Sequence, residues 1–296
     1  MKKALKRCFA LIFAFTFIFT IFAMTASAAN YTPRELTLST VKDKNLYSYT
    51  SGDIILNGKK LSEQARIIGS VVYLPIRAFA GAAVPGATVT YNQATRTITL
   101  TANSLKLTAT DGAYVVYAND RPLFTTTPVT ILSNGRMYVP STTLAKAFGL
   151  SHSQNGKAVS LSGAYTPLAH ADKFYREDEV LWLSRIIKAE SEGESLLGKI
   201  AVGNVVLNRV KSKDFPNTIY GVIFDRKYGV QFTPVLNGTI YNTPGYTEKL
   251  AAKICLEGVS LSSDVLFFLA PSKSTSFWIV NTRKYAFTVG GHDFFY

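Results

Sequence analysis

The stretch AESEGESLLGKIAVGNVVLNRV, residues 189–210, places three glutamates directly before a long apolar segment. Acidic residues at the start of a helix stabilise it through the helix dipole, so capping is one interpretation of this cluster. The other is that one of the three carboxyl groups takes part in chemistry. The choice depends on which side of a helix each glutamate occupies.

Glu190 closes the preceding segment, EDEVLWLSRIIKAE (residues 177–190), which has apolar residues at positions 180, 183, 186 and 187. This spacing predicts an amphipathic helix on which Leu183, Ile187 and Glu190 share one face. A carboxyl group on the buried face loses hydration, which raises its pKa towards the range that a general acid needs. A partly buried, salt-bridged Glu190 without a chemical role fits the same spacing.

For the other two glutamates, the sequence gives less indication of a catalytic role. Glu194 falls one turn beyond Glu190 if the helix persists, so it either caps the next helix or supports Glu190. Glu192 points to a different side and is expected to be solvated.

The chain changes character along its length. Residues 30–163 alternate in the manner of strands, and Asn57-Gly58 is a hairpin-type turn signal. Residues 164–178 read as a linker, and residues 179–296 have helical segments followed by aromatic-rich strands. Helices first and strands last predict an α+β domain.

The β-rich half repeats internally. The stretch GSVVYLPIRAFAGA (residues 69–82) resembles NGRMYVPSTTLAKAFGL (residues 134–150), and a strand hairpin is expected after each. We therefore predict two copies of a strand–helix–hairpin unit packed into one domain.

The composition and the first residues indicate export. Residues 1–29 combine a basic start, an apolar run and small residues at the end, which is typical of a signal peptide, although the run is nearly long enough for a retained anchor. Without the four cations of this segment the formal charge falls from +13 to +9. A basic exported protein suits anionic wall polymers, and no nucleic-acid-reading motif is evident. No later segment is long and apolar enough to span a membrane.

Cysteine and histidine are scarce. Outside residues 1–29 the only cysteine is Cys255, expected to be a small core residue. The three histidines, His152, His170 and His292, lack ligand-like spacing, so we predict neither a metal site nor a cofactor.

The β-rich half resembles the bacterial copper amine oxidase N-terminal-like domain, a repeated module of exported wall-associated proteins. The similarity covers most of residues 54–162 and rests on the two Tyr-x-Pro units. The stretch has a single histidine and no cysteine, so the resemblance implies a spacer or wall-binding module without copper.

Residues 181–296 resemble the SleB/CwlJ family of bacterial cell wall hydrolases. The similarity is carried by AESEGE, GKIAVGNVVLNRVKSKDFPNTIYGVIF, QFTPV, LFFLAP and VGGHDFFY, in that order. It implies a lysozyme-like fold in which Glu190 is catalytic. Glu192 stands where the family has an arginine, and the loop before Gln231 is longer than usual.

The resemblance also suggests substrate-binding residues. Glu194 matches the last glutamate of the motif, and Gln231 and Phe232 match a Gln-Phe signature. Gln231 is expected to bind an acetamido group, and Phe232 either packs on a sugar or belongs to the core. His292 matches a terminal motif and is expected to be a structural or cleft residue.

The function implied is an exported enzyme, in the cell wall or spore envelope, that cleaves the bond between N-acetylmuramic acid and N-acetylglucosamine in peptidoglycan strands. Lytic transglycosylation, in which one carboxyl group serves as acid and then base, is the expected reaction, with muramidase hydrolysis second. An N-acetylmuramoyl-L-alanine amidase and a non-catalytic wall-binding protein remain as alternatives.

Overall fold

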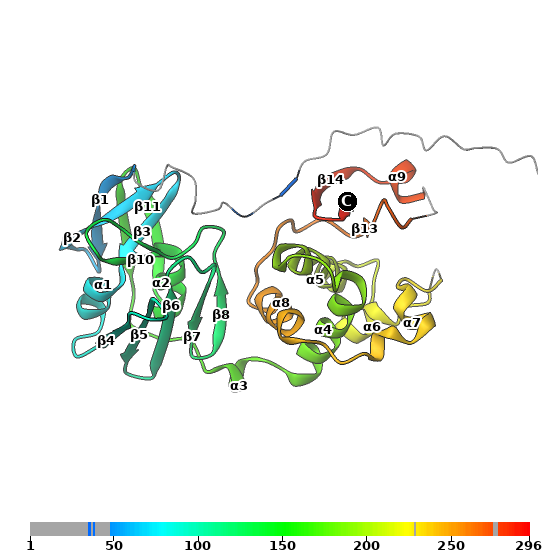
Figure 1. Ribbon diagram of the computed structural model, residues 1–296, viewed down its shortest axis with the longest axis horizontal. Coiled ribbons are helices and arrows are strands. Elements are labelled where there is room, and N and C mark those ends of the chain that lie inside the picture. Colours follow the sequence, from blue (N-terminus) through cyan, green and yellow to red (C-terminus); the bar gives the residue numbers. More distant parts are fainter. Residues whose placement is uncertain (1–34, 37, 39–47, 228, 275–277) are drawn as a thin grey trace, which may run out of the picture. The chain divides into compact units, whose positions relative to one another are not determined.

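The computed structural model describes residues 35–36, 38, 48–227, 229–274 and 278–296 (Figure 1). The predicted signal peptide, residues 1–29, lies outside the described residues. Within the described part of the chain, no helix combines the length and the apolar character needed to cross a bilayer. The structure is mixed α+β, as predicted, and we call residues 50–162 the β-rich domain and residues 171–296 the C-terminal domain.

The internal repeat predicted from the Tyr-x-Pro motifs is confirmed. Each copy is a strand, a helix and a hairpin: β3 (Val71–Pro75), α1 (Ile76–Ala83), β4 (Thr88–Asn92) and β5 (Thr97–Ala102), then β10 (Met137–Pro140), α2 (Ser141–Phe148), β11 (Ser151–Asn155) and β12 (Ala158–Ser162). The strands β3 and β10 pair antiparallel, with Tyr138 opposite Pro75 and Pro140 opposite Tyr73. Equivalent residues therefore exchange partners across the pair, which gives the two copies a local two-fold relation.

Two sheets enclose the core of the β-rich domain (Figure 1). Their other strands are β1 (Thr50–Leu56), β2 (Lys59–Ile68), β6 (Leu105–Thr110), β7 (Val115–Ala118), β8 (Arg121–Phe124) and β9 (Thr130–Ile131). One sheet has the order β11-β12-β1-β2-β3-β10-β9 and the other β4-β5-β6-β7-β8. Asn57 and Gly58, between β1 and β2, have φ angles of +48° and +78°, as a type I′ hairpin turn requires.

The C-terminal domain is built on three helices, α4 (Glu177–Ser191), α5 (Leu196–Lys211) and α8 (Tyr246–Leu256). Shorter elements surround them: α3 (Ala171–Phe174), α6 (Ile219–Ile223), α7 (Thr233–Asn237), the 3₁₀ helix η2 (Thr239–Tyr241) and α9 (Trp278–Thr282). The strands β13 (Phe267–Leu269), β14 (Tyr285–Val289) and β15 (His292–Phe295) form a sheet in the order β13-β15-β14. Helix α3 and the first residues of α4 fall within residues 164–178, the segment that the sequence analysis interprets as a linker.

Helix α5 is buried on most of its circumference, which explains why its sequence is apolar on nearly every side. Gly203 faces α8, where an added Cβ would lie 2.7 Å from Cys255 Sγ. The expectation that Cys255 is a core residue is confirmed, because it is 2% exposed and burial raises the pKa of its thiol.

The polar side chains of α5 bind the chain segment that leads into the three-stranded sheet. Asn204 donates to the Val259 carbonyl and accepts from the Leu261 amide, at 2.7 and 2.9 Å. Asn208 donates to the carbonyls of Ser262 and Val265, at 2.8 and 2.9 Å. Asn208 is therefore a buried residue that fixes the segment before β13.

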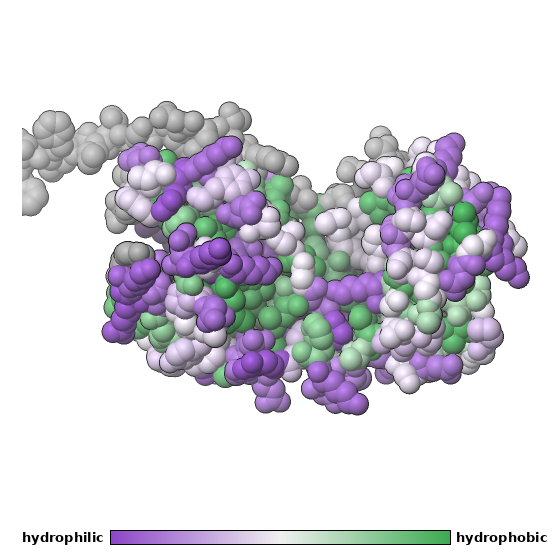
Figure 2. All heavy atoms as spheres, turned by 180° about the vertical axis from the view of Figure 1, so that it is seen from behind, coloured by the Kyte–Doolittle hydropathy of each residue, from purple (hydrophilic) through white to green (hydrophobic). Residues whose placement is uncertain are grey.

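The face seen from behind is chemically mixed. Figure 2 shows hydrophilic and hydrophobic residues interspersed over it, with the hydrophobic ones in small groups. Apolar residues interspersed with polar ones are normal on protein surfaces.

Asn208→Ala tests the attachment of α5 to the segment before β13. The variant leaves the Val265 carbonyl buried without its donor, so we expect the free energy of unfolding to fall by about 2 kcal/mol. Denaturant unfolding followed by tryptophan fluorescence reports on this domain, which contains both tryptophans, Trp182 and Trp278.

Asn242→Ala is the matched control, because Asn242 is exposed. It should change the free energy of unfolding by no more than about 0.5 kcal/mol. Equal losses in the two variants would contradict a specific role for the Asn208 hydrogen bonds.

Candidate active site

A cavity of about 1040 Å³ opens in the C-terminal domain. Its walls come from the end of α4, the end of α5, the segment before α7, strand β13, the residues after β13, and β15. The volume is at the upper end of the range for ligand pockets, so the cavity accommodates an extended ligand. Of the residues proposed from the sequence, Glu190, Gln231, Phe232 and His292 line it.

Glu190 lies in the last turn of α4, on the face that carries the buried Leu183 and Ile187. Burial raises the pKa of its carboxyl group to about 7, and the positive charge of Arg209 acts in the opposite direction. The raised pKa expected from the spacing of the helix is therefore found. A carboxyl group with this pKa holds its proton near neutrality, as a general acid must.

A buried lysine fixes the end of the helix that carries Glu190. Lys199 Nζ, from α5, donates to the carbonyls of Ser191 and Glu192, at 2.6 Å each, and lies 3.4 Å from Glu248 Oε1. Carbonyl groups at a helix C-terminus have no partner within the helix, and a cation there also complements the helix dipole. Lys199 thus stabilises the last turn of α4 and the position of Glu190.

Glu194 does not lie on the helix of Glu190, and it is not among the residues that line the cavity. Helix α4 ends at Ser191, and Ser195 is the N-cap of α5, where its hydroxyl accepts from the Gly198 amide. Glu194 would follow Glu190 by one helical turn only if the helix persisted, and this condition is not met because the helix stops between them.

The Glu194 carboxylate instead supports the turn before β15. It accepts a hydrogen bond from the Gly291 amide at 3.3 Å, and its Oε1 lies 3.4 Å from His292 Nδ1. Burial lowers the pKa of His292, against the pull of the Glu194 charge, so the imidazole is held neutral at the wall of the cavity. Glu194 therefore contacts a residue that lines the cavity, His292, without lining the cavity itself.

Gln231 and Phe232 lie side by side before α7. Gln231 Nε2 donates to the Gly229 carbonyl at 3.2 Å. Phe232 is only 3% exposed, and it packs in the core formed by α4, α5 and α8. The core interpretation of Phe232 is confirmed, and the little surface that it exposes faces the cavity.

Exposed aromatic rings border the cavity. Trp278 and Tyr296 line it and are 52% and 41% exposed, whereas Tyr285 is not part of its wall. Arg283 extends over the rings of Phe267 and Trp278, with its guanidinium carbon 4.3 and 5.2 Å from the ring centroids. These flat apolar faces, next to charged groups, suit a ligand that is both polar and ring-shaped.

Arg209 is a buried, charged lining residue to which the sequence analysis assigned no role. It is 5% exposed, and its Nε donates to the Leu266 carbonyl at 2.8 Å. The signal available in the sequence was the recurrence of polar residues at positions 204, 208 and 209 of an otherwise apolar helix. That pattern indicates a polar edge but does not show what the edge faces.

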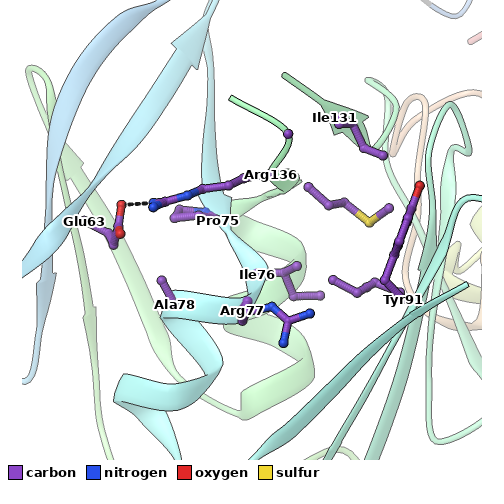
Figure 3. Close-up of a pocket in the computed structure, with 11 residues that line it drawn as sticks. Glu63, Pro75, Ile76, Arg77, Ala78, Tyr91, Ile131 and Arg136 are labelled. Carbon is purple, nitrogen blue, oxygen red and sulfur yellow. Dashed lines mark hydrogen bonds and ion pairs between the residues drawn. The ribbon is translucent and has the colours of Figure 1, made fainter. Parts of the chain in front are cut away.

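A second, smaller cavity of about 420 Å³ lies in the β-rich domain (Figure 3). Tyr91 stands on one side of it, and the ion pair between Glu63 and Arg136 stands on the other. Glu63 is the only carboxylate among its lining residues, which include no histidine or cysteine. The cavity therefore does not fit copper. Across all described residues, no three His, Cys, Asp or Glu side chains are grouped to hold a metal ion.

The C-terminal domain thus holds a carboxyl group of raised pKa in the wall of an aromatic-bordered cavity. Comparison with protein families matches residues 193–296 to the cell wall hydrolase domain and residues 55–162 to the copper amine oxidase N-terminal domain. The first match begins just after Glu190.

Curated relatives agree with the first match. A spore cortex-lytic enzyme of Bacillus cereus is 38% identical over 120 residues, which cover 40% of this chain and 45% of the relative. Cell wall hydrolase CwlJ of Oceanobacillus iheyensis is 33% identical over 103 residues, covering 33% of this chain and 72% of the relative. This chain belongs to the cell wall hydrolase family. It spans less than half the length of the spore cortex-lytic enzymes that it matches.

Among solved structures, the chain is similar to the catalytic domain of the germination-specific lytic transglycosylase SleB from Bacillus anthracis. The two are 36% identical, with a TM-score of 0.38, over 41% of this chain and 97% of the other.

Gly290→Ala tests the support of His292 by Glu194. An added Cβ would lie 2.1 Å from Glu194 Oε2, so the carboxylate must leave its place under the turn. We expect the variant to lose about 2 to 3 kcal/mol of stability, the sum of a left-handed backbone penalty and this displacement. An NMR titration should also show a changed pKa for His292.

Gly258→Ala separates the two causes. Gly258 also has a positive φ, +90°, but nothing lies within 4 Å of an added Cβ. It should lose only the backbone penalty, about 1 kcal/mol, and leave the His292 titration unchanged. If both variants shift that titration alike, Glu194 does not control His292.

Proposed function

We propose that this chain is an exported peptidoglycan-degrading enzyme that cleaves the bond between N-acetylmuramic acid and N-acetylglucosamine. The observation that carries the proposal is the buried carboxyl group of Glu190 in the wall of the cavity, whose pKa burial raises to about 7. Membership of the cell wall hydrolase family and similarity to spore cortex-lytic enzymes support a peptidoglycan substrate. Cell wall or spore envelope would be its place of action, where its basic surface suits anionic wall polymers.

In the proposed reaction, Glu190 donates its proton to the glycosidic oxygen. The bond from the muramyl C1 to that oxygen breaks, its electron pair stays with the oxygen, and N-acetylglucosamine leaves with a 4-hydroxyl group. The Glu190 carboxylate then removes the proton from the muramyl 6-hydroxyl, whose oxygen bonds to C1. The product is a 1,6-anhydro ring, Glu190 regains its proton, and no water is consumed.

The number of carboxyl groups favours transglycosylation over hydrolysis. Glycosidases of the two-carboxylate type need a second acid across the scissile bond. Besides Glu190, only Asp214 among the lining residues carries a side-chain carboxyl group, and Asp214 is exposed. Transglycosylation needs only Glu190. Hydrolysis with Asp214 as the base is the second candidate reaction. The products distinguish hydrolysis from transglycosylation.

The remaining lining residues fit substrate binding. Trp278 and Tyr296 offer ring faces to sugars, and Gln231 offers an amide to an acetamido group. His292, held neutral above Glu194, is placed to exchange a hydrogen bond with the ligand. We assign Glu194 the task of positioning His292.

Glu190→Gln tests the proposal, because the amide cannot donate and recover the proton. We expect release of muropeptides from purified peptidoglycan to fall at least a thousand-fold, within the range expected for loss of general acid–base catalysis. Mass spectrometry of the digest identifies the products. Anhydro-muropeptides from the unchanged protein indicate transglycosylation, and reducing muropeptides indicate hydrolysis.

Glu192→Gln is the matched control. Glu192 belongs to the same glutamate cluster but is exposed and paired with Lys188, so its loss should leave the rate within about two-fold. Peptide-free glycan in the digest would point to an amidase. An uncleaved polymer that the protein nevertheless binds would point to a wall-binding protein, and either result would overturn the proposal.

The pH dependence of the reaction gives a second test. A general acid works only in its protonated form, so activity should fall about ten-fold per pH unit above the Glu190 pKa of about 7. An ordinary glutamate would produce the same decline from a pH between 4 and 5. Initial rates of muropeptide release between pH 4 and 9, about the window of both cases, locate the decline.

A further inference from the structure

Arg209 is a buried cation in the wall of the cavity, with one nitrogen that makes no hydrogen bond to a described residue. Its Nη1 is buried and makes no hydrogen bond to any described residue. Arg209 also forms no ion pair with a carboxylate in the described part of the chain, although it lines the same cavity as Glu190. Buried cations are normally paired, so an unpaired guanidinium nitrogen indicates a function.

The surroundings hold the guanidinium group in one place. The Leu266 carbonyl accepts from its Nε at 2.8 Å. The rings of Phe215, Phe232 and Phe267 lie around it, with centroids 4.9, 5.1 and 5.5 Å from the guanidinium carbon. A cation packed among aromatic faces is attracted to them without being neutralised. Its charge is therefore held in place but not cancelled by these contacts.

Arg209 remains charged despite burial. Desolvation lowers its pKa to about 10, against the influence of Asp225 and Glu190, so it stays protonated near neutrality. Glu190 is in the opposite condition, because its pKa of about 7 keeps it largely protonated below that pH. Before the reaction, the site therefore contains a charged guanidinium group and a carboxyl group that is mostly neutral below pH 7.

Proton transfer from Glu190 changes this balance. When the proton moves to the glycosidic oxygen, Glu190 becomes a carboxylate, and its attraction to Arg209 appears only then. An interaction that is stronger in the transition state than in the ground state accelerates the reaction. A fixed cation pays no reorganisation cost at that moment, because the rings and the Leu266 carbonyl already hold it.

We propose that Arg209 is the positioning residue that stabilises the carboxylate form of Glu190 during proton transfer and so sets the strength of the acid. The inference rests on the proposed function of Glu190. The other charged or titratable side chains of the cavity are Asp214 after α5, Lys273 and Arg283 after β13, and His292 and Tyr296 at β15. Among the described residues that line the cavity, Arg209 is the one whose charge lowers the Glu190 pKa.

Arg209→Gln tests this through the pH profile. Without the cation the Glu190 pKa rises, so the alkaline decline in activity should move to higher pH by about one unit, while the maximal rate falls at least ten-fold. Arg209→Lys keeps a cation and should keep the decline within about half a unit of its original position. Arg209→Met, which retains packing between the rings, is a second variant without charge in case the glutamine variant does not fold.

Asn208→Ala is the control for a purely structural role. Asn208 fixes the neighbouring part of the same segment, through Ser262 and Val265, but does not line the cavity. It should lower stability without moving the alkaline decline. Rates are measured with the full chain on solubilised glycan strands, together with Glu190→Gln.

The outcomes separate the two proposals. Activity retained in Glu190→Gln overturns the proposed function. If Glu190→Gln is inactive but both charge-free variants of Arg209 keep the original pH profile, Arg209 does not act on Glu190. A raised KM with an unmoved profile would make Arg209 a substrate-binding residue instead and would also overturn the inference. A profile that moves in the charge-free variants and stays in Arg209→Lys and Asn208→Ala supports it.

Discussion

The hydrogen bonds from the polar edge of α5 to the segment before β13 are the constraint on which the site depends. Three side chains, Asn204, Asn208 and Arg209, bind the backbone between Val259 and Leu266. Apolar packing is not directional, so packing against a buried helix would not by itself fix the register of an irregular segment. The hydrogen bonds supply the missing direction. The three-stranded sheet follows directly, so these bonds hold the wall of the cavity that β13 forms.

Burial serves two opposite purposes at the cavity. For Glu190 it favours the proton on a carboxyl group that would be ionised in water, and for Arg209 it leaves Nη1 without a hydrogen-bond partner among the described residues. Both states cost stability, and both are held by neighbouring contacts, Lys199 at the end of α4 and the aromatic rings around the guanidinium. A functional site commonly lowers the stability of the protein locally, and contacts elsewhere in the fold offset this loss.

Much of the fold could be predicted because its signals are local. The Tyr-x-Pro repeats, the turn at Asn57-Gly58 and the apolar spacing before Glu190 each occupy a few consecutive residues, and the structure contains all three features. The burial of Glu190 follows from the same spacing, since residues three and four apart share a helical face. The placement of Glu194 depended on whether the helix continued past Ser191, which the spacing of apolar residues left open, and the helix ends there.

By itself, the sequence determined the order of the domains, the duplicated β-rich unit and the face of α4 on which Glu190 lies. Only the tertiary structure decided that Glu194 supports His292, nearly a hundred residues away, and that Arg209 shares a cavity with Glu190. The physical reason is that periodicity reports which side of an element is buried and not what covers it. Contacts between distant segments depend on how whole elements pack, and no local pattern of residues encodes that arrangement.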